Sequence, residues 1–212
     1  MTADTAVLRL GFRSFWLHAR GEGGGADYDL VMERDPSGLP ILRGRHLAGL
    51  LRVAFARADR WGWFDNPPAT GVEALLMGGF GNGMPGCLDI RSARVPDPLR
   101  STLVSVPGLI EACFQRLPTT AIDPVRGVAK TGHLRTIEAA MPMQLEARIR
   151  FDASDRLAWS GGTSADVDNG RRTWIDWLRC ALPALDEAGA KRTRGFGRLG
   201  RCDVITGGVP AR

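Results

Sequence analysis

A turn followed by an amphipathic helix in residues 35–60 constrains the fold of this chain more than any other stretch. Residues 35–38 read D-P-S-G, where Pro36 presets its own φ and Gly38 tolerates a left-handed backbone, so a tight turn is favoured. From Gly44 onwards, apolar residues recur at the three- and four-residue spacing of one helix face. We therefore predict a helix that starts at Gly44 and buries one face. The apolar residues of that face are Leu47, Leu50, Leu51, Ala54, Phe55 and Ala58.

Basic residues cluster at the predicted start of this helix. Arg43, Arg45 and His46 lie there, and Arg52 follows on the polar face. Cations at a helix N-terminus oppose the helix dipole, which favours anions at that end. Guanidinium groups beside the free N–H groups of a first helical turn suit a phosphate ligand. A solvated basic face explains this cluster equally well, and both interpretations stay open at this point.

The composition limits the class of protein. The chain has 212 residues, 44% of them hydrophobic, which is enough to bury a core. No run approaches the roughly 18 apolar residues of a membrane span, and no signal-peptide core is present, so we expect a soluble cytoplasmic protein without a membrane partner. The four cysteines form no C-x-x-C pair, so we expect reduced thiols. The net charge of +5, carried mostly by arginine, suggests an anionic polymer as partner, although a GC-rich genome also enriches arginine.

Other periodicities predict the remaining elements. Residues 107–117 read as weakly helical, and residues 119–138 predict a long hairpin with a basic tip. A polar loop is expected over residues 161–169, and a second helix from Gly170. Further elements are expected as strands at residues 5–17, 87–95 and 141–151, a helical turn at 72–77, and a last strand after the glycine-arginine loop 190–198.

A formal G-x-G-x-x-G stands at Gly81, Gly83 and Gly86. A dinucleotide-binding fingerprint needs a strand before it and a helix after it. Here Pro85 interrupts the motif and a strand-like alternation follows, so we reject that function.

With the hairpin set aside, the order of elements is β-α-β-β-α-β. This order predicts an α+β protein with a ferredoxin-like (RRM-like) core, in a single domain over residues 1–212 with the hairpin inserted. The fold hosts many functions and decides little by itself, but its open sheet is frequent in RNA-binding modules.

Three motifs together carry a resemblance to a known family. They are D-P-S-G-L-P-I-L-R-G-R-H-L-A-G-L-L-R, T-A-I-D-P-V-R-G-V-A-K-T-G-H-L-R-T-I-E and R-G-F-G-R-L, in this order along the chain. The chain resembles members of the RAMP superfamily, and within it the small repeated backbone subunit of type III CRISPR effector complexes. The resemblance covers nearly the whole chain.

The resemblance implies a function in antiviral defence. Copies of the subunit would stack along a guide RNA with other effector subunits, and the hairpin would act as a thumb that splays one base pair between guide and target RNA. Active members are metal-dependent endoribonucleases that cleave the target RNA at each interruption. The cofactor implied is Mg²⁺ or another divalent cation, held weakly because Mg²⁺ keeps most of its water and borrows phosphate oxygens.

The resemblance also implies site residues. The family pattern places the catalytic and metal-binding aspartate six residues before the aspartate of the turn, which is Asp29 here, and Asp27 is the rival candidate. His18 and Arg20 would position the phosphate as further catalytic and RNA-binding candidates. The other expected RNA contacts are Arg43, Arg45, His46, Arg52, Arg126, Lys130, Arg194, Gly195, Phe196, Gly197 and Arg198.

Three alternatives stay open. The chain is either a cleaving backbone subunit, a catalytically silent backbone or capping subunit, or a metal-independent guide-processing ribonuclease that uses a histidine as general acid or base. Neither the subtype, the copy number nor the neighbouring subunits follow from the sequence.

Overall fold

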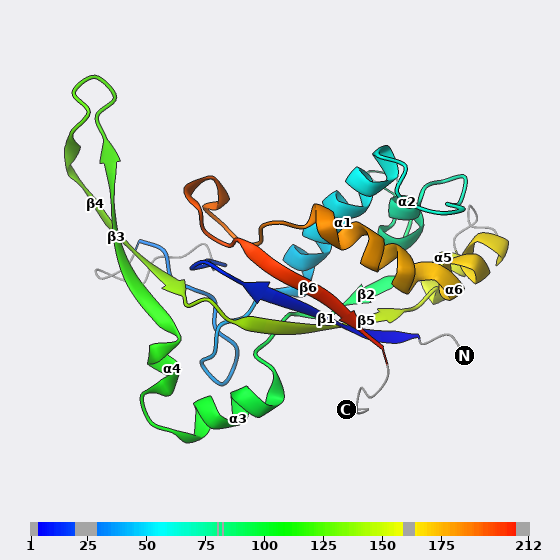
Figure 1. The fold of residues 1–212 in the computed structure, drawn as a ribbon, viewed down its shortest axis with the longest axis horizontal. Helices are drawn as coiled ribbons and strands as arrows, with labels where there is room; N and C mark the ends of the chain where they lie inside the picture. The colour runs from blue at the N-terminus through cyan, green and yellow to red at the C-terminus, as the bar shows by residue number, and fades with distance from the viewer. Residues whose placement is uncertain (1–3, 20–28, 80, 82, 159–163, 207–212) are drawn as a thin grey trace.

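The computed structural model describes residues 4–19, 29–79, 81, 83–158 and 164–206, and its centre is a four-stranded sheet (Figure 1). The strand order is β2-β5-β1-β6, and every neighbouring pair is antiparallel. The first and third strands of the β-α-β-β-α-β order therefore lie in the middle of the sheet, which confirms the predicted ferredoxin-like core. The strands are β1 (Thr5–Phe12), β2 (Leu88–Ile90), β5 (Gln144–Phe151) and β6 (Leu199–Ile205).

Two long helices, α1 (Gly44–Arg60) and α6 (Ser164–Ala181), cover one face of this sheet (Figure 1). The predicted helix start at Gly44 and all six apolar positions of its buried face are confirmed. They pack against the inward residues of β1, where Leu8 and Leu10 are fully buried. Burial of each such leucine stabilises the folded chain by about 1.5–3 kcal/mol. The core lies between these helices and the sheet. Shorter helices at the same side are α2 (Val72–Met77), α5 (Ser154–Ala158) and the 3-10 turn Leu182–Ala184.

The start of α1 lies against the edge of the sheet. The Gly44 N–H donates to Ser92 Oγ at 3.1 Å, and a Cβ on Gly44 would stand only 2.4 Å from the carbonyl oxygen of Ile90. Glycine is therefore needed here because of close approach, since no side chain fits between helix and strand. This contact fixes where the basic N-terminus of α1 lies relative to β2.

A second, two-stranded sheet leaves the body of the protein as a long thumb, which we define as residues 114–140 (Figure 1). It consists of β3 (Phe114–Ile122) and β4 (Ala129–Ala140), paired from Phe114↔Ala140 outwards. At the tip, Asp123 Oδ1 accepts the N–H groups of Val125 and Arg126 at 2.8 and 3.1 Å. The hairpin expected over 119–138 is thus longer at both ends, because the pairing of β3 with β4 continues to Phe114 and Ala140 at the base of the thumb.

Some predicted boundaries were wrong. The first turns of α6 include residues 164–169, expected as a polar loop, because the buried Val167 stands among polar residues and forms no recurring apolar stripe with them. Only α4 (Leu109–Ala112) is helical within residues 107–117, and the strand predicted over 5–17 ends at Phe12. A helix α3 (Asp97–Ser105) was not predicted, since it contains no buried residue and so lacks a core-facing pattern. Among the described helices, none is long and apolar enough to cross a membrane.

Candidate functional site

Asp29 is fixed at the root of the thumb. Its backbone N–H donates to the carbonyl oxygen of Thr136 at 2.9 Å, and its carboxylate oxygen Oδ2 accepts the Thr136 N–H at 2.8 Å. One residue on, Leu30 makes a parallel bridge to Ile137 of β4. The Asp29 side chain is exposed, so a carboxylate is presented to solvent from a backbone that β4 holds in place. The two other candidates from this loop, Asp27 and Arg20, lie outside the described residues.

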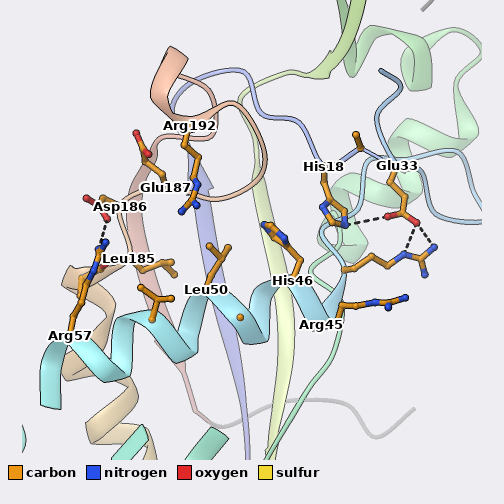
Figure 2. Close-up of a pocket in the computed structure, with 15 residues that line it drawn as sticks. His18, Glu33, Arg45, His46, Leu50, Arg57, Leu185, Asp186, Glu187 and Arg192 are labelled. Atoms are coloured by element: carbon orange, nitrogen blue, oxygen red, sulfur yellow. Dashed lines mark hydrogen bonds and ion pairs between the residues drawn. The ribbon is translucent and has the colours of Figure 1, made fainter. Parts of the chain in front are cut away.

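A cavity of about 870 Å³ opens beside the start of α1 (Figure 2). His18 and Glu33 line one side, and Arg192, from the 3-10 turn Arg192–Arg194, points into it opposite α1 (Figure 2). The N-terminal turns of α1 contribute Arg45 and His46. Three separate segments of the chain thus bring cations and imidazoles to one surface, and Glu33 adds a carboxylate.

Glu33 pairs with both His18 and Arg43 in this cavity. His18 Nε2 lies 3.2 Å from Glu33 Oε2, and Glu33 Oε1 accepts Arg43 Nε at 2.7 Å. The His46 ring is the neighbour of His18, with ring centroids 4.9 Å apart, and its Nε2 is buried without a hydrogen-bond partner in the described structure. Glu33 thereby holds both the imidazole of His18 and the guanidinium of Arg43 in position.

Burial keeps both histidines uncharged near neutral pH. Loss of solvation lowers the pKa of His18, nearby His46 lowers it further, and Glu33 raises it in part. Loss of solvation also lowers the pKa of His46, and the positive charge of Arg192 adds to this. A neutral imidazole has one donor and one acceptor nitrogen, so each ring can accept a proton or a hydrogen bond from a ligand.

The free energy of unfolding is therefore expected to fall as pH is lowered through the ordinary histidine pKa of 6.5. Below that value the unfolded chain binds protons at His18 and His46 that the folded chain resists, so acidification favours unfolding. Urea denaturation at about pH 7.5 and about pH 5.5 measures this difference. Replacing both residues, His18→Gln with His46→Gln, should flatten the dependence, and an unchanged slope would contradict these pKa shifts.

Arg52, expected to contact RNA, makes its bonds within the protein. Its guanidinium forms an ion pair with Glu73 and donates to the carbonyl oxygens of Met77 and Gly78, the latter at 2.8 Å. These carbonyls lie at the C-terminal end of α2, where a cation is favoured. Arg52 thus ties α1 to α2, and it does not line the cavity described above.

The two glycines of R-G-F-G have different surroundings. Gly197 has φ +72°, donates to the carbonyl oxygen of Phe15 at 2.7 Å, and leaves no room for a Cβ, which would lie 1.9 Å from the Ala188 oxygen. Gly195 has φ +81° and open space around it. Gly197 therefore holds the loop against the body, while Gly195 leaves the backbone accessible.

The remaining expected contacts are distributed over the surface. Arg194, Arg198 and Arg126 are exposed, Phe196 is half-buried, and Lys130 is exposed on β4 near the thumb tip. Arg192 and Glu33, which line the cavity, were not singled out from the sequence, although Arg192 stands in the same basic run as Arg194.

The described residues contain no group of three or more His, Cys, Asp or Glu side chains placed to hold a metal ion. The exposed Asp29 carboxylate fits a weaker arrangement, in which one carboxylate joins water and phosphate oxygens around Mg²⁺.

The comparisons with known proteins agree with this architecture. The fold is similar to a chain of a type III-B Cmr-beta complex bound to cognate target RNA, with a TM-score of 0.64, 12% identity, and 96% of this chain and 98% of that chain covered. A chain of the apo Cmr-beta complex gives a TM-score of 0.63 at 12% identity and the same coverage. No curated protein matches the sequence. The model of the RAMP superfamily matches residues 16–200, and the chain therefore belongs to the RAMP superfamily.

Proposed function

We propose that this chain is a guide-RNA-binding backbone subunit of a type III-like CRISPR ribonucleoprotein in the cytoplasm, and that it cleaves target RNA complementary to the guide. The observation that carries the proposal is the thumb with Asp29 hydrogen-bonded to its root. The thumb would act as a wedge that opens an RNA duplex. A carboxylate at its base would then lie next to the opened position, where a nuclease could cut.

The thumb tip has the properties of such a wedge. Apolar side chains stand exposed there, Val125 being 91% exposed, with Ile122 and Leu134 nearby on the two strands. Proteins that insert apolar side chains between base steps unstack them, and flanking cations hold the phosphates. Arg126 and Lys130 supply cations next to these apolar residues.

The cavity beside α1 suits the backbone of the guide. Arg45 and Arg192 carry charge toward a ligand, and His46 adds a buried nitrogen that has no partner within the described protein. Phosphate and 2′-OH contacts position a strand without reading its sequence, so guide binding is expected to be sequence-tolerant, with base pairing reading the target.

Cleavage at the thumb root needs a nucleophile and a group that accepts its proton. The 2′-OH next to the scissile phosphate is such a nucleophile: its oxygen attacks phosphorus, the bond from phosphorus to the 5′-oxygen breaks, and that oxygen takes up a proton from water, which leaves a 2′,3′-cyclic phosphate and a 5′-hydroxyl. Asp29 would accept the proton or hold the divalent cation. When bound, Mg²⁺ supplies charge stabilisation at the phosphate.

The neighbours support the partners proposed here. The similar chain in the target-bound type III-B complex belongs to an assembly that holds RNA, and membership of the RAMP superfamily agrees with this. Guide RNA, target RNA, further copies of the chain and other effector subunits are the partners we propose.

A second candidate is a metal-independent guide-processing ribonuclease. The His18–Glu33 pair favours it, because a neutral histidine held by a carboxylate in a cavity is suited to general acid or base catalysis. In this case the catalytic site would be the cavity rather than the thumb root.

Cleavage of a labelled, guide-complementary RNA by the assembled complex separates the candidates. We expect regularly spaced products in Mg²⁺ and none in excess chelator. Cleavage of a labelled guide precursor that persists in chelator and disappears with His18→Ala would favour the second candidate. Tight guide and target binding without cleavage would make the chain a silent scaffold or cap.

A further inference from the structure

One exposed ridge of α1 continues beyond the cavity. Residues at every fourth position, Arg45, Gly49, Val53, Arg57 and Trp61, are all exposed. The first four line the cavity, and Trp61 follows directly after the last residue of α1. At 1.5 Å per residue the ridge covers about 24 Å along the helix axis from Arg45 to Trp61, and it winds around α1 because 3.6 residues make one turn, so a strand that follows it winds with it.

An exposed pair of indole rings stands at the far end of this ridge. Trp61 is 54% exposed and Trp63 is 39% exposed, and their ring centroids lie 4.8 Å apart with an angle of 45° between the rings. Large aromatic rings usually leave water on folding, so exposure of two in contact indicates a binding surface.

The backbone under the two rings is held rigidly. The Trp61 N–H donates to the Arg57 carbonyl oxygen and the Trp63 N–H to the Ala58 carbonyl oxygen, both at 3.0 Å. Cys180 Sγ lies 3.1 Å from the Trp63 carbonyl oxygen. Hydrogen bonds therefore fix the backbone that carries the two rings, so binding a ligand would cost little backbone entropy.

The next residue anchors this segment in the core. Phe64 is buried between Phe55 of α1 and Trp177 of α6, with ring centroids 6.2 and 6.4 Å from its own. Trp177 Nε1 also donates to the Asp65 carbonyl oxygen at 3.3 Å. The chain therefore buries Phe64 and turns its two tryptophan neighbours outward.

We propose that a single-stranded segment of RNA leaves the cavity along this ridge and stacks one unpaired base on Trp61, with Trp63 supporting the ring. This inference rests on the proposed RNA-binding function. Stacking on an indole is open to every base, so the site is sequence-tolerant like the guide contacts.

Charge along the ridge agrees with RNA rather than a protein segment. Arg57 donates to the carbonyl oxygen of Ala184 at 3.1 Å and lies 3.7 Å from Asp186, yet its side chain remains 47% exposed. An exposed ion pair of this kind is weak, so a phosphate can replace Asp186. Arg60, also exposed, adds a second cation beside Trp61. Exposed cations next to an aromatic ring suit a nucleic acid strand.

Binding of an oligouridylate of about ten nucleotides to the full chain tests the inference. We expect Trp61→Leu to weaken binding roughly tenfold and Trp61→Phe to weaken it much less. RNA should also quench the tryptophan fluorescence, and Trp61→Leu should remove most of that quenching. Trp16, Trp174 and Trp177 are buried and should not contribute.

A matched control and an altered ligand sharpen the result. Leu99→Ala removes another exposed apolar side chain, 45% exposed on α3, and should leave RNA binding unchanged. An oligonucleotide with abasic positions should bind the wild type more weakly and should not distinguish the wild type from Trp61→Leu.

The possible failures are distinguishable. If the wild type binds RNA but Trp61→Leu binds equally well, this inference is overturned and the proposed function stands. A loss of self-association in Trp61→Leu, with RNA affinity retained, would assign the surface to a second copy of the chain instead. If the wild type binds no RNA, both the inference and the proposed function are overturned.

Discussion

Asp29→Asn is expected to slow target-RNA cleavage by about a hundredfold to a thousandfold while the complex still binds guide and target. The asparagine side chain keeps a carbonyl oxygen that can accept the Thr136 N–H, which Asp29 Oδ2 accepts at 2.8 Å. It removes only the negative charge that holds a cation or takes a proton. A single-turnover cleavage assay with a labelled target measures the loss.

Asp29→Ala serves as the comparison because it removes both the charge and the hydrogen bond to Thr136. If the charge is what matters, both substitutions slow cleavage to a similar extent, and only Asp29→Ala loosens the thumb. Asp27→Asn tests the rival aspartate in the same assay. Full cleavage in both Asp29→Asn and Asp27→Asn would contradict an active site at the thumb root.

Arg100→Ala is expected to lower the free energy of unfolding by about 3–5 kcal/mol. The Asp35 side chain, at the D-P-S-G turn, is only 1% exposed and forms an ion pair with Arg100. Its Oδ1 accepts the Ser37 and Leu39 N–H groups at 2.8 and 3.2 Å. Without the guanidinium, a carboxylate would remain buried without its counter-charge. Urea denaturation measures the change.

Two further variants test this cause. Asp35→Asn combined with Arg100→Ala should recover part of the loss, because no uncompensated charge is then buried. Arg91 lies 3.0 Å from Asp89 in an ion pair at the surface, and its side chain is 69% exposed. Arg91→Ala should therefore lower the free energy of unfolding by at most about 1 kcal/mol. Equal losses in Arg100→Ala and Arg91→Ala would contradict the account of the turn.

The sequence predicted the parts of the fold that a local apolar pattern specifies. The stripe of α1 and the alternation of β1 each bury one face, so their periodicity was sufficient to find them. Helix α3 has no buried residue, and in the first turns of α6 the buried Val167 stands among polar residues, so no repeating apolar pattern predicted either segment. The order of elements was enough to predict the ferredoxin-like core because few topologies fit it.

The candidate site was predictable only in part, because it is assembled from distant segments. The basic cluster at the start of α1 was visible in the sequence, but the ion pair of Arg43 with Glu33 is a tertiary contact, and so is the position of Arg192 in the same cavity. Arg52 stands on the same helix as Arg45, yet its bonds to α2 depend on packing that no spacing reveals. The bond from Asp29 to Thr136 likewise joins residues 107 positions apart.

The mass of complexes that the purified chain forms with guide RNAs of two lengths, measured by native mass spectrometry, tests the central claim most directly. A guide-RNA-binding backbone makes heterologous contacts that do not close, so the RNA limits how many copies assemble. We expect several copies on the shorter guide and proportionally more on the longer one, regardless of guide sequence. One copy on both guides, or no binding to either, would contradict the account.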